Sequence, residues 1–257
     1  MTDKQQIFYQ LVAMSRALGD PANDYVLLGE GNTSARVDEE AFFVKASGTR
    51  LESIEESGFV EVRFEGVLAL LEKENLSDEQ IRAGLEAAKV SPDCPLRPSV
   101  ETILHARALS SGAAKFVGHT HPTVVNAILC SQAAEEAFAG RLFPDEIVVC
   151  GPAPVYIPYT DPGLPLARAV WAGVERHTDL YGQWPKVILL QNHGLVVLGQ
   201  SAQEVVDTTA MAVKTAQVLL GTYTLGAPHF LSARQVARLR TRPDEEYRRR
   251  VLGMSRV

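Results

Sequence analysis

The sequence predicts a single α/β domain. Its 257 residues, 46% hydrophobic and 22% charged, can build a sizeable core and are typical of a globular protein. Segments with helical apolar periodicity alternate with short strand-like runs, without repeats. The proline-containing stretch at residues 89–98 is a loop too short to link two domains. We therefore expect one domain over residues 1–257, with a basic helical tail at residues 231–257.

Local patterns predict the elements in chain order. The first helix is amphipathic, with Ile7, Leu11 and Leu18 near one side, and the last helix before the tail ends at Gly221. We expect helices at residues 5–18, 67–74, 78–88, 98–109, 164–177 and 202–220. We expect strands at residues 34–37, 42–45, 116–121, 147–149, 155–157 and 186–191, and a further apolar run at 195–197.

The charge pattern argues against nucleic acid as a partner. The net charge is −6, which gives no general attraction to a polyanion. The tail at 231–257 nevertheless carries eight arginines against three acidic residues, so the preceding part carries about −11. An acidic body favours docking of this tail on the protein itself, or a subunit contact, over binding of an acidic polymer.

Composition also indicates a cytoplasmic protein that does not enter a membrane. No apolar run approaches the roughly 20 residues of a membrane helix. The first residues lack the basic and apolar sections of a signal peptide. Cys94, Cys130 and Cys150 are odd in number and form no C-x-x-C motif, which indicates a reducing compartment.

The segment His119-Thr120-His121 is the strongest candidate for chemistry. It follows the apolar residues 116–118 of a predicted strand, in which residues two apart point to the same face. Two adjacent imidazoles suit a divalent metal such as zinc. Taken alone, however, they could equally be two partly buried histidines without a ligand.

His193 is the candidate third ligand. An apolar run ends at Asn192-His193-Gly194 and then resumes, and polar residues between two buried strands are costly without a partner. The alternative is a histidine in an ordinary β-hairpin turn, because Asn-His-Gly is also plausible turn chemistry.

Glu101 and His105 lie four residues apart on one face of the helix predicted at 98–109, for which Ser99 is the expected N-cap. Glu101 could direct a carboxylate at the metal, or merely complement the helix dipole. Spacing alone leaves both interpretations open. His105 is expected to pack or to support the site rather than to act as a ligand.

Two glycine-containing segments could bind an anion. Gly29-Glu30-Gly31-Asn32 lacks the third glycine of a dinucleotide-binding motif. Lys45-Ala46-Ser47-Gly48-Thr49 follows a strand and offers N–H groups, hydroxyls and an ammonium. A plain tight turn is the alternative for each segment.

Five motifs occur in one order along the chain. They are Gly31-Asn32-Thr33-Ser34, Lys45-Ala46-Ser47-Gly48, Pro98-Ser99-Val100-Glu101, His119-Thr120-His121 and Asn192-His193-Gly194-Leu195. This series resembles the class II aldolase/adducin family, which includes fuculose- and rhamnulose-phosphate aldolases and ribulose-phosphate 4-epimerase. The resemblance extends from about residue 5 to residue 220.

The resemblance implies a mainly antiparallel central sheet flanked by helices on both faces, and a homotetramer. It assigns zinc binding to His119, His121 and His193. Glu101 matches the glutamate that ligates the metal in the empty site and acts as acid/base once substrate displaces it. The positions that match the substrate-phosphate site of the sugar-phosphate aldolases are Asn32, Ser47, Gly48 and Ser99.

Departures from the family pattern concern this anion site. Val100 stands where the phosphate-binding aldolases often have a second serine, and Lys45-Ala46 stands where they often have Thr-Pro. Our hypothesis is that the anion site is rebuilt around Lys45, or that the substrate bears a carboxylate or no phosphate. The tyrosines that assist some aldolases have no clear match; Tyr156, Tyr159, Tyr181 and Tyr223 are candidates.

We therefore expect a metal-dependent aldolase that reversibly cleaves a ketose or ketose phosphate through a zinc-stabilised enediolate, with Glu101 as acid/base. Manganese, cobalt or iron could replace zinc. A 4-epimerase, a dehydratase and a decarboxylase of a 3-oxo acid phosphate are alternatives. A non-catalytic adducin-like module is a further one, although such a module has no reason to keep all four ligands.

Overall fold

The structure is a computed structural model that describes residues 2–251 and 253. A seven-stranded sheet forms its centre, in the order β3-β2-β1-β4-β7-β6-β5. The strands are β1 (Asn32–Arg36), β2 (Ala41–Lys45), β3 (Phe59–Arg63), β4 (Phe116–Thr120), β5 (Val155–Ile157), β6 (Val187–Leu190) and β7 (Gly194–Gly199). All neighbouring pairs are antiparallel except β5 and β6. The expected mainly antiparallel α/β fold is confirmed.

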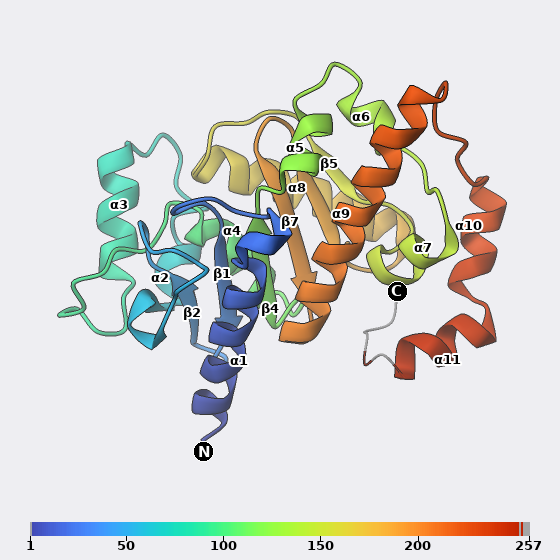
Figure 1. The fold of residues 1–257 in the computed structure, drawn as a ribbon. Helices are drawn as coiled ribbons and strands as arrows, with labels where there is room; N and C mark the ends of the chain where they lie inside the picture. Colours follow the sequence, from blue (N-terminus) through green and yellow to red (C-terminus); the bar gives the residue numbers. More distant parts are fainter. Residues whose placement is uncertain (1, 252, 254–257) are drawn as a thin grey trace.

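Helices cover both faces of the sheet (Figure 1). On one face lie α1 (Asp3–Leu18), α5 (Thr123–Leu129), α6 (Ala134–Ala137), α7 (Pro144–Cys150) and α9 (Ala202–Thr224). On the other lie α2 (Phe64–Leu68), α3 (Asp78–Ala87), α4 (Thr102–Ser110) and α8 (Leu164–Tyr181). Short 3-10 turns at Pro21–Asn23 and Glu56–Gly58 complete the connections.

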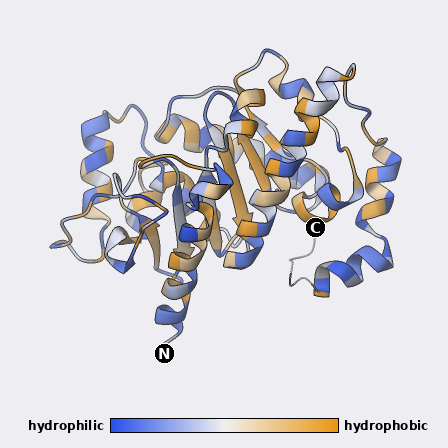
Figure 2. Cartoon of the chain, in the orientation of Figure 1, coloured by the Kyte–Doolittle hydropathy of each residue, from blue (hydrophilic) through white to orange (hydrophobic). Residues whose placement is uncertain are grey.

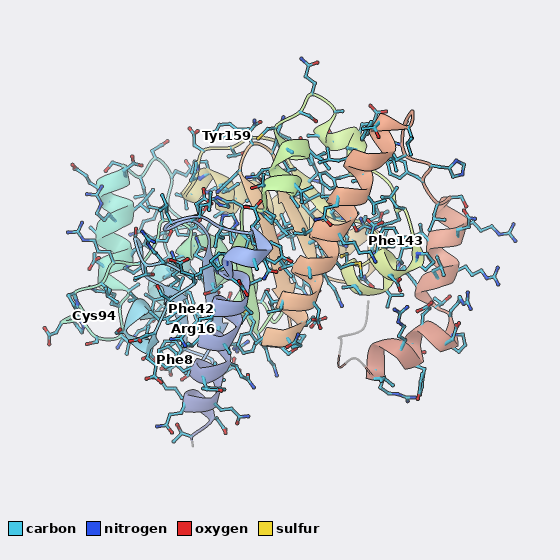
Figure 3. All side chains as sticks on the ribbon, viewed as in Figure 1. Phe8, Arg16, Phe42, Cys94, Phe143 and Tyr159 are labelled. Carbon is cyan, nitrogen blue, oxygen red and sulfur yellow. The ribbon has the colours of Figure 1, made fainter. Side chains whose placement is uncertain are left out.

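Each face of the sheet has its own apolar core, because alternate residues of a strand point to opposite faces. Phe42 is fully buried in one core and stacks on Phe64, with ring centroids 4.8 Å apart. Phe43 belongs to the other core, where Phe8 of α1, labelled in Figure 3, stacks on it with ring centroids 4.3 Å apart. The central strands β6 and β7 are correspondingly hydrophobic, whereas the outer helices show hydrophilic faces (Figure 2).

The tail expected at 231–257 begins with two helices, α10 (Ala233–Arg240) and α11 (Pro243–Val251). Ser232 caps α10 through a capping box with Gln235. α10 contacts α7, and Arg248 of α11 forms an ion pair with Asp145 at the start of α7. In the part of the chain that the structure describes, no helix combines the length and apolar character needed to cross a bilayer.

One predicted strand is a helix. Residues 147–149, expected as a strand, lie in α7. Pro144 occupies the first turn of α7, where a proline needs no N–H partner, and two acidic residues follow it. Gly151, at φ 87°, ends the helix. The β-branched residues are therefore buried in a short helix rather than in a strand.

Other predicted boundaries also shift. The helix expected at 67–74 is α2, which starts earlier because Phe64 enters the core, and it ends at Leu68. The helix expected at 98–109 starts at Thr102, so Glu101 rather than Ser99 occupies the N-cap position. Gly221 does not end α9, which continues to Thr224.

Candidate metal centre

His119 and His121 are presented at one end of the central strand β4. His119 pairs with Asn32 of β1 on one side and with Val196 of β7 on the other, so its backbone is fixed from both sides. His121 follows the last strand residue, and its backbone N–H donates to Tyr25 O at 2.8 Å. The two Nε2 atoms lie 2.9 Å apart. The strand therefore places both imidazoles side by side, as the H-x-H spacing predicted.

His193 joins them from the turn between β6 and β7. Asn192 adopts φ 54°, which reverses the chain and directs the next side chain toward β4. The His193 carbonyl accepts a hydrogen bond from Asn126 Nδ2 of α5 at 3.0 Å. His193 Nε2 lies 3.3 Å from His119 Nε2. His193 is thus both a hairpin-turn residue and a member of the histidine cluster.

The three histidines have the chemistry that a divalent metal requires. One ligand atom from each lies within 4.8 Å of the others. His119 Nδ1 lies 3.1 Å from Leu195 O, which identifies Nδ1 as the protonated nitrogen and leaves the Nε2 lone pair directed at the cluster. Burial lowers the pKa of His119 and takes the pKa of His121 to about 3, so both rings are neutral at pH 7. Converging neutral imidazoles are the donor set that zinc and similar ions accept.

Glu101 lies against this cluster. Its Oε1 is 3.2 Å from His193 Nε2 and its Oε2 is 3.6 Å from His119 Nε2. Asn32 Nδ2 donates to Oε2 at 2.6 Å. The Glu101 carboxylate therefore points at the histidine cluster.

Glu101 stays ionised in this setting. Burial by itself would raise the pKa of Glu101, but attraction to His119 and hydrogen bonding with His193 and Asn32 outweigh burial and hold the pKa well below its usual value. At His119 the effect of burial outweighs the attraction to Glu101, so the pKa of the ring is lowered. The site thus combines one ionised carboxylate with three converging imidazoles.

His105 supports the site from α4 and does not join the cluster. It is fully buried, and its Nδ1 lies 2.7 Å from Ser34 Oγ. Burial lowers its pKa to about 3. This agrees with the expectation of a packing or supporting role.

The two predicted anion-type turns lie beside each other and beside the segment that leads to Glu101. Ser47 N–H donates to Arg97 O at 2.9 Å, and Ala46 forms a bridge with Pro98. Gly29 approaches Gly48 closely, since a Cβ on Gly29 would lie 3.8 Å from Gly48 Cα. The geometry therefore brings these two turns together with the 97–101 segment.

Individual groups in this region are available to a ligand. Within the described residues, the Ser47 hydroxyl and the Gly48 N–H have no hydrogen-bond partner, and Ser47 and Gly48 are exposed. Ser99 Oγ instead accepts from Glu101 N–H at 3.3 Å. Asn32 uses its amide nitrogen on Glu101, while its buried Oδ1 has no partner.

Lys45 is placed differently from the hydroxyls. It alternates with Val44 along β2 and therefore lies on the sheet face of Phe43, where it is almost fully buried. Its ammonium donates to Gly29 O at 3.1 Å. Burial lowers its pKa to about 8, although Glu101 counteracts this. Lys45 thus adds positive charge from beneath the turn.

The candidate tyrosines are scattered. Tyr159 lies at an exposed edge of the molecule (Figure 3), and its N–H donates to Gln191 in the turn before His193. Tyr156 lies in β5, Tyr181 packs on His177 at the end of α8, and Tyr223 lies near the end of α9. Tyr159 is thus the candidate tied to the β6–β7 turn.

Glu30 was missed by the sequence analysis. It sits between the two glycines before β1, and its Oε1 lies 3.9 Å from His121 Nδ1. Its position within a G-x-G segment, next to the motif that contains Asn32, was the available signal.

Comparison with known proteins identifies the family. The family model described as Class II Aldolase and Adducin N-terminal domain matches residues 9–220. The uncharacterized oxidoreductase YuxG of Bacillus subtilis (strain 168) is 27% identical over 201 residues, which are 74% of this chain. The match covers only 26% of YuxG, so the chain spans about a quarter of that relative.

Solved structures share the fold. The N-terminal class II aldolase domain of a conserved Thermoplasma acidophilum protein is 27% identical, with a TM-score of 0.65 over 82% of this chain and 92% of that domain. YgbL of Klebsiella pneumoniae, described as a candidate aldolase/epimerase/decarboxylase, is 23% identical with a TM-score of 0.70, covering 93% and 99% of the two chains. L-fuculose 1-phosphate aldolase from Glaciozyma antarctica PI12 is 18% identical with a TM-score of 0.62, covering 92% and 80%. The chain belongs to the class II aldolase/adducin family.

Proposed function

We propose that the protein is a metal-dependent aldolase that reversibly cleaves a ketose or ketose phosphate, with zinc as the metal. The observation that carries the proposal is the convergence of three imidazoles and one ionised carboxylate at one point. His119, His121 and His193 would hold the metal, and Glu101 would complete the ligand set in the empty site. Three nitrogen ligands leave coordination positions open, which is the pattern of catalytic rather than structural zinc.

A divalent ion held by these histidines would supply a Lewis acid that polarises a substrate carbonyl. The chain supplies the proton transfer. In the cleavage direction, Glu101 accepts the proton of the hydroxyl on the carbon that leaves as the aldehyde. The C–C bond then breaks, and its electron pair stays on the α-carbon of the carbonyl fragment. Glu101 returns the proton to this α-carbon. In the condensation direction Glu101 removes the same α-proton.

The second part of the site would orient the substrate. The Ser47 hydroxyl and the Gly48 N–H point to recognition of a phosphate or carboxylate, since their hydrogen-bonding capacity is free in the described structure. Lys45 contributes its charge from beneath this turn, with its ammonium already engaged by Gly29. This arrangement supports orientation of the far end of the substrate, which lowers the entropic cost of reaching the transition state.

Replacement of Glu101 by glutamine tests the proposal. The variant keeps the shape of the side chain and should retain bound zinc, while turnover falls by at least about 100-fold, the usual contribution of a general acid/base. Glu52→Gln is the control, because Glu52 is a half-exposed glutamate that pairs with Arg50. Turnover of Glu101→Gln within tenfold of wild type would place the proton transfer elsewhere. Purified protein without metal, and unaffected by chelation, would favour an adducin-like module.

Related enediolate reactions form the second candidate function. The protein has the same fold as YgbL, which is described as a candidate aldolase, epimerase or decarboxylase. This similarity favours including the related reactions. A panel of ketose phosphates, unphosphorylated ketoses and 3-oxo acids, assayed for aldehyde, epimer and CO₂, separates these reactions. The oxidoreductase name of YuxG supports no redox proposal, because the match covers only about a quarter of that protein.

A further inference from the structure

The loop before β1 holds a carboxylate in a fixed direction. Glu30 N–H donates to Leu27 O at 3.0 Å, which closes a turn in which Leu28 adopts φ 54°. Leu27 N–H in turn donates to Glu30 Oε2 at 2.9 Å. The Glu30 side chain is therefore anchored through one oxygen, and the other oxygen is available to a neighbour.

That neighbour is His121. Glu30 Oε1 lies 3.9 Å from His121 Nδ1, while Nε2 of the same ring faces His119. A proton on Nδ1 directed at the carboxylate leaves the Nε2 lone pair toward the other histidines. The two nitrogens of His121 thus face an outer carboxylate and the candidate metal position, respectively.

We propose that Glu30 is a positioning residue for the metal centre, which acts through His121. This inference rests on the proposed metal-dependent function. The carboxylate selects the Nδ1–H tautomer, fixes the plane of the ring and raises the basicity of Nε2. The Leu195 carbonyl directs the Nδ1 proton of His119 in the same way, whereas the group that faces Nδ1 of His121 is a carboxylate at 3.9 Å.

The loop that carries Glu30 is itself held against the site. Gly31 adopts φ 66°, and a Cβ there would lie 2.6 Å from His119 O, so only glycine allows this close approach. Lys45 donates to Gly29 O, and Asn32 at the end of the loop donates to Glu101. One short segment therefore positions both a histidine ligand and the catalytic carboxylate.

Glu30→Gln is the direct test. The amide oxygen can still accept from Leu27 N–H, so the turn is preserved while the negative charge facing His121 is lost. We expect the zinc dissociation constant, measured by competition with a fluorescent chelator, to rise about 10- to 100-fold. The melting temperature of the metal-free protein should stay unchanged, because Glu30 is 44% exposed in its side chain.

Glu52→Gln is the matched control, since the Glu52 side chain is 41% exposed and pairs with Arg50 rather than with a histidine. It should bind zinc as wild type does. A zinc dissociation constant for Glu30→Gln within twofold of wild type would overturn the positioning role while leaving the proposed function intact. Failure of the wild type itself to bind zinc would overturn both.

Discussion

Replacing Gly194 by alanine adds one methyl group at the closest point between β7 and the histidines. Gly194 begins β7 and faces the end of β4. A Cβ there would lie 2.6 Å from Thr120 O, 2.7 Å from His121 Cδ2 and 3.3 Å from His119 Cε1. Because nonbonded carbon atoms settle at about 3.5 Å or more, the His121 ring must retreat by about 0.8 Å.

This displacement exceeds what a metal site tolerates. Zinc–nitrogen bonds are about 2.0–2.1 Å long, with a tolerance of about 0.2 Å. A shift of about 0.8 Å would therefore take His121 out of the proposed ligand set. We expect at least a tenfold weaker zinc affinity, and a loss of unfolding free energy of about 1–3 kcal/mol from overpacking. Chelator competition and urea denaturation of the metal-free protein measure the two effects separately.

Gly221→Ala is the control. Gly221 lies within helix α9 and a Cβ there meets nothing within 4 Å. It should stabilise the protein by about 0.5–1 kcal/mol through helix propensity and leave zinc binding unchanged. If Gly194→Ala binds zinc as tightly as wild type, the histidines are not held against β7 in the way described.

Three further predictions concern the body of the protein. Phe42→Ala should cost about 3–5 kcal/mol in urea denaturation, because the ring is fully buried and stacked on Phe64, and a cost below 1.5 kcal/mol would contradict that packing. Exposed Cys130 should react with a thiol reagent at pH 8, whereas Cys150, whose pKa burial raises to about 12, should react only after unfolding; equal rates would contradict its burial. Burial and two nearby arginines lower the pKa of His177 to about 4. Between about pH 6.5 and pH 4, His177 is therefore protonated in the unfolded state but not in the folded state. Unfolding free energy should therefore fall from about pH 6.5 to 4 by up to about 3 kcal/mol more in wild type than in His177→Phe, and parallel pH profiles would argue against it.

The sequence predicted that two histidines of the cluster lie together because their geometry is local. A strand places residues two apart on the same face, which is enough to pair His119 with His121. Asn192-His193-Gly194 was recognisable as an interruption between two apolar runs. The order of the motifs supplied the remaining expectation, that Glu101 approaches these histidines.

The sequence could not predict features that depend on register or on competing propensities. Glu30 meets His121 only because Asn32 pairs with His119 across β1 and β4, and no local pattern encodes that register. The β-branched residues 147–149 favour a strand in isolation, yet the proline and acidic residues that precede them start a helix that buries them against α9. Strand alternation likewise puts Lys45 on the same face of the sheet as Phe43, but the sequence alone does not say which core covers that face.

The separation of the ligands along the chain also has a consequence for folding. His119 and His193 are 74 residues apart and meet because β4 and β7 are neighbours at the centre of the sheet. An unfolded chain offers only the His119–His121 pair, so a tight metal site arises only after the central strands have paired. An ion that prefers the native state in this way raises the melting temperature in proportion to the logarithm of its concentration. Zinc would then bind late in folding and stabilise the pairing of β4 with β7. Its release would occur as soon as these two strands separate.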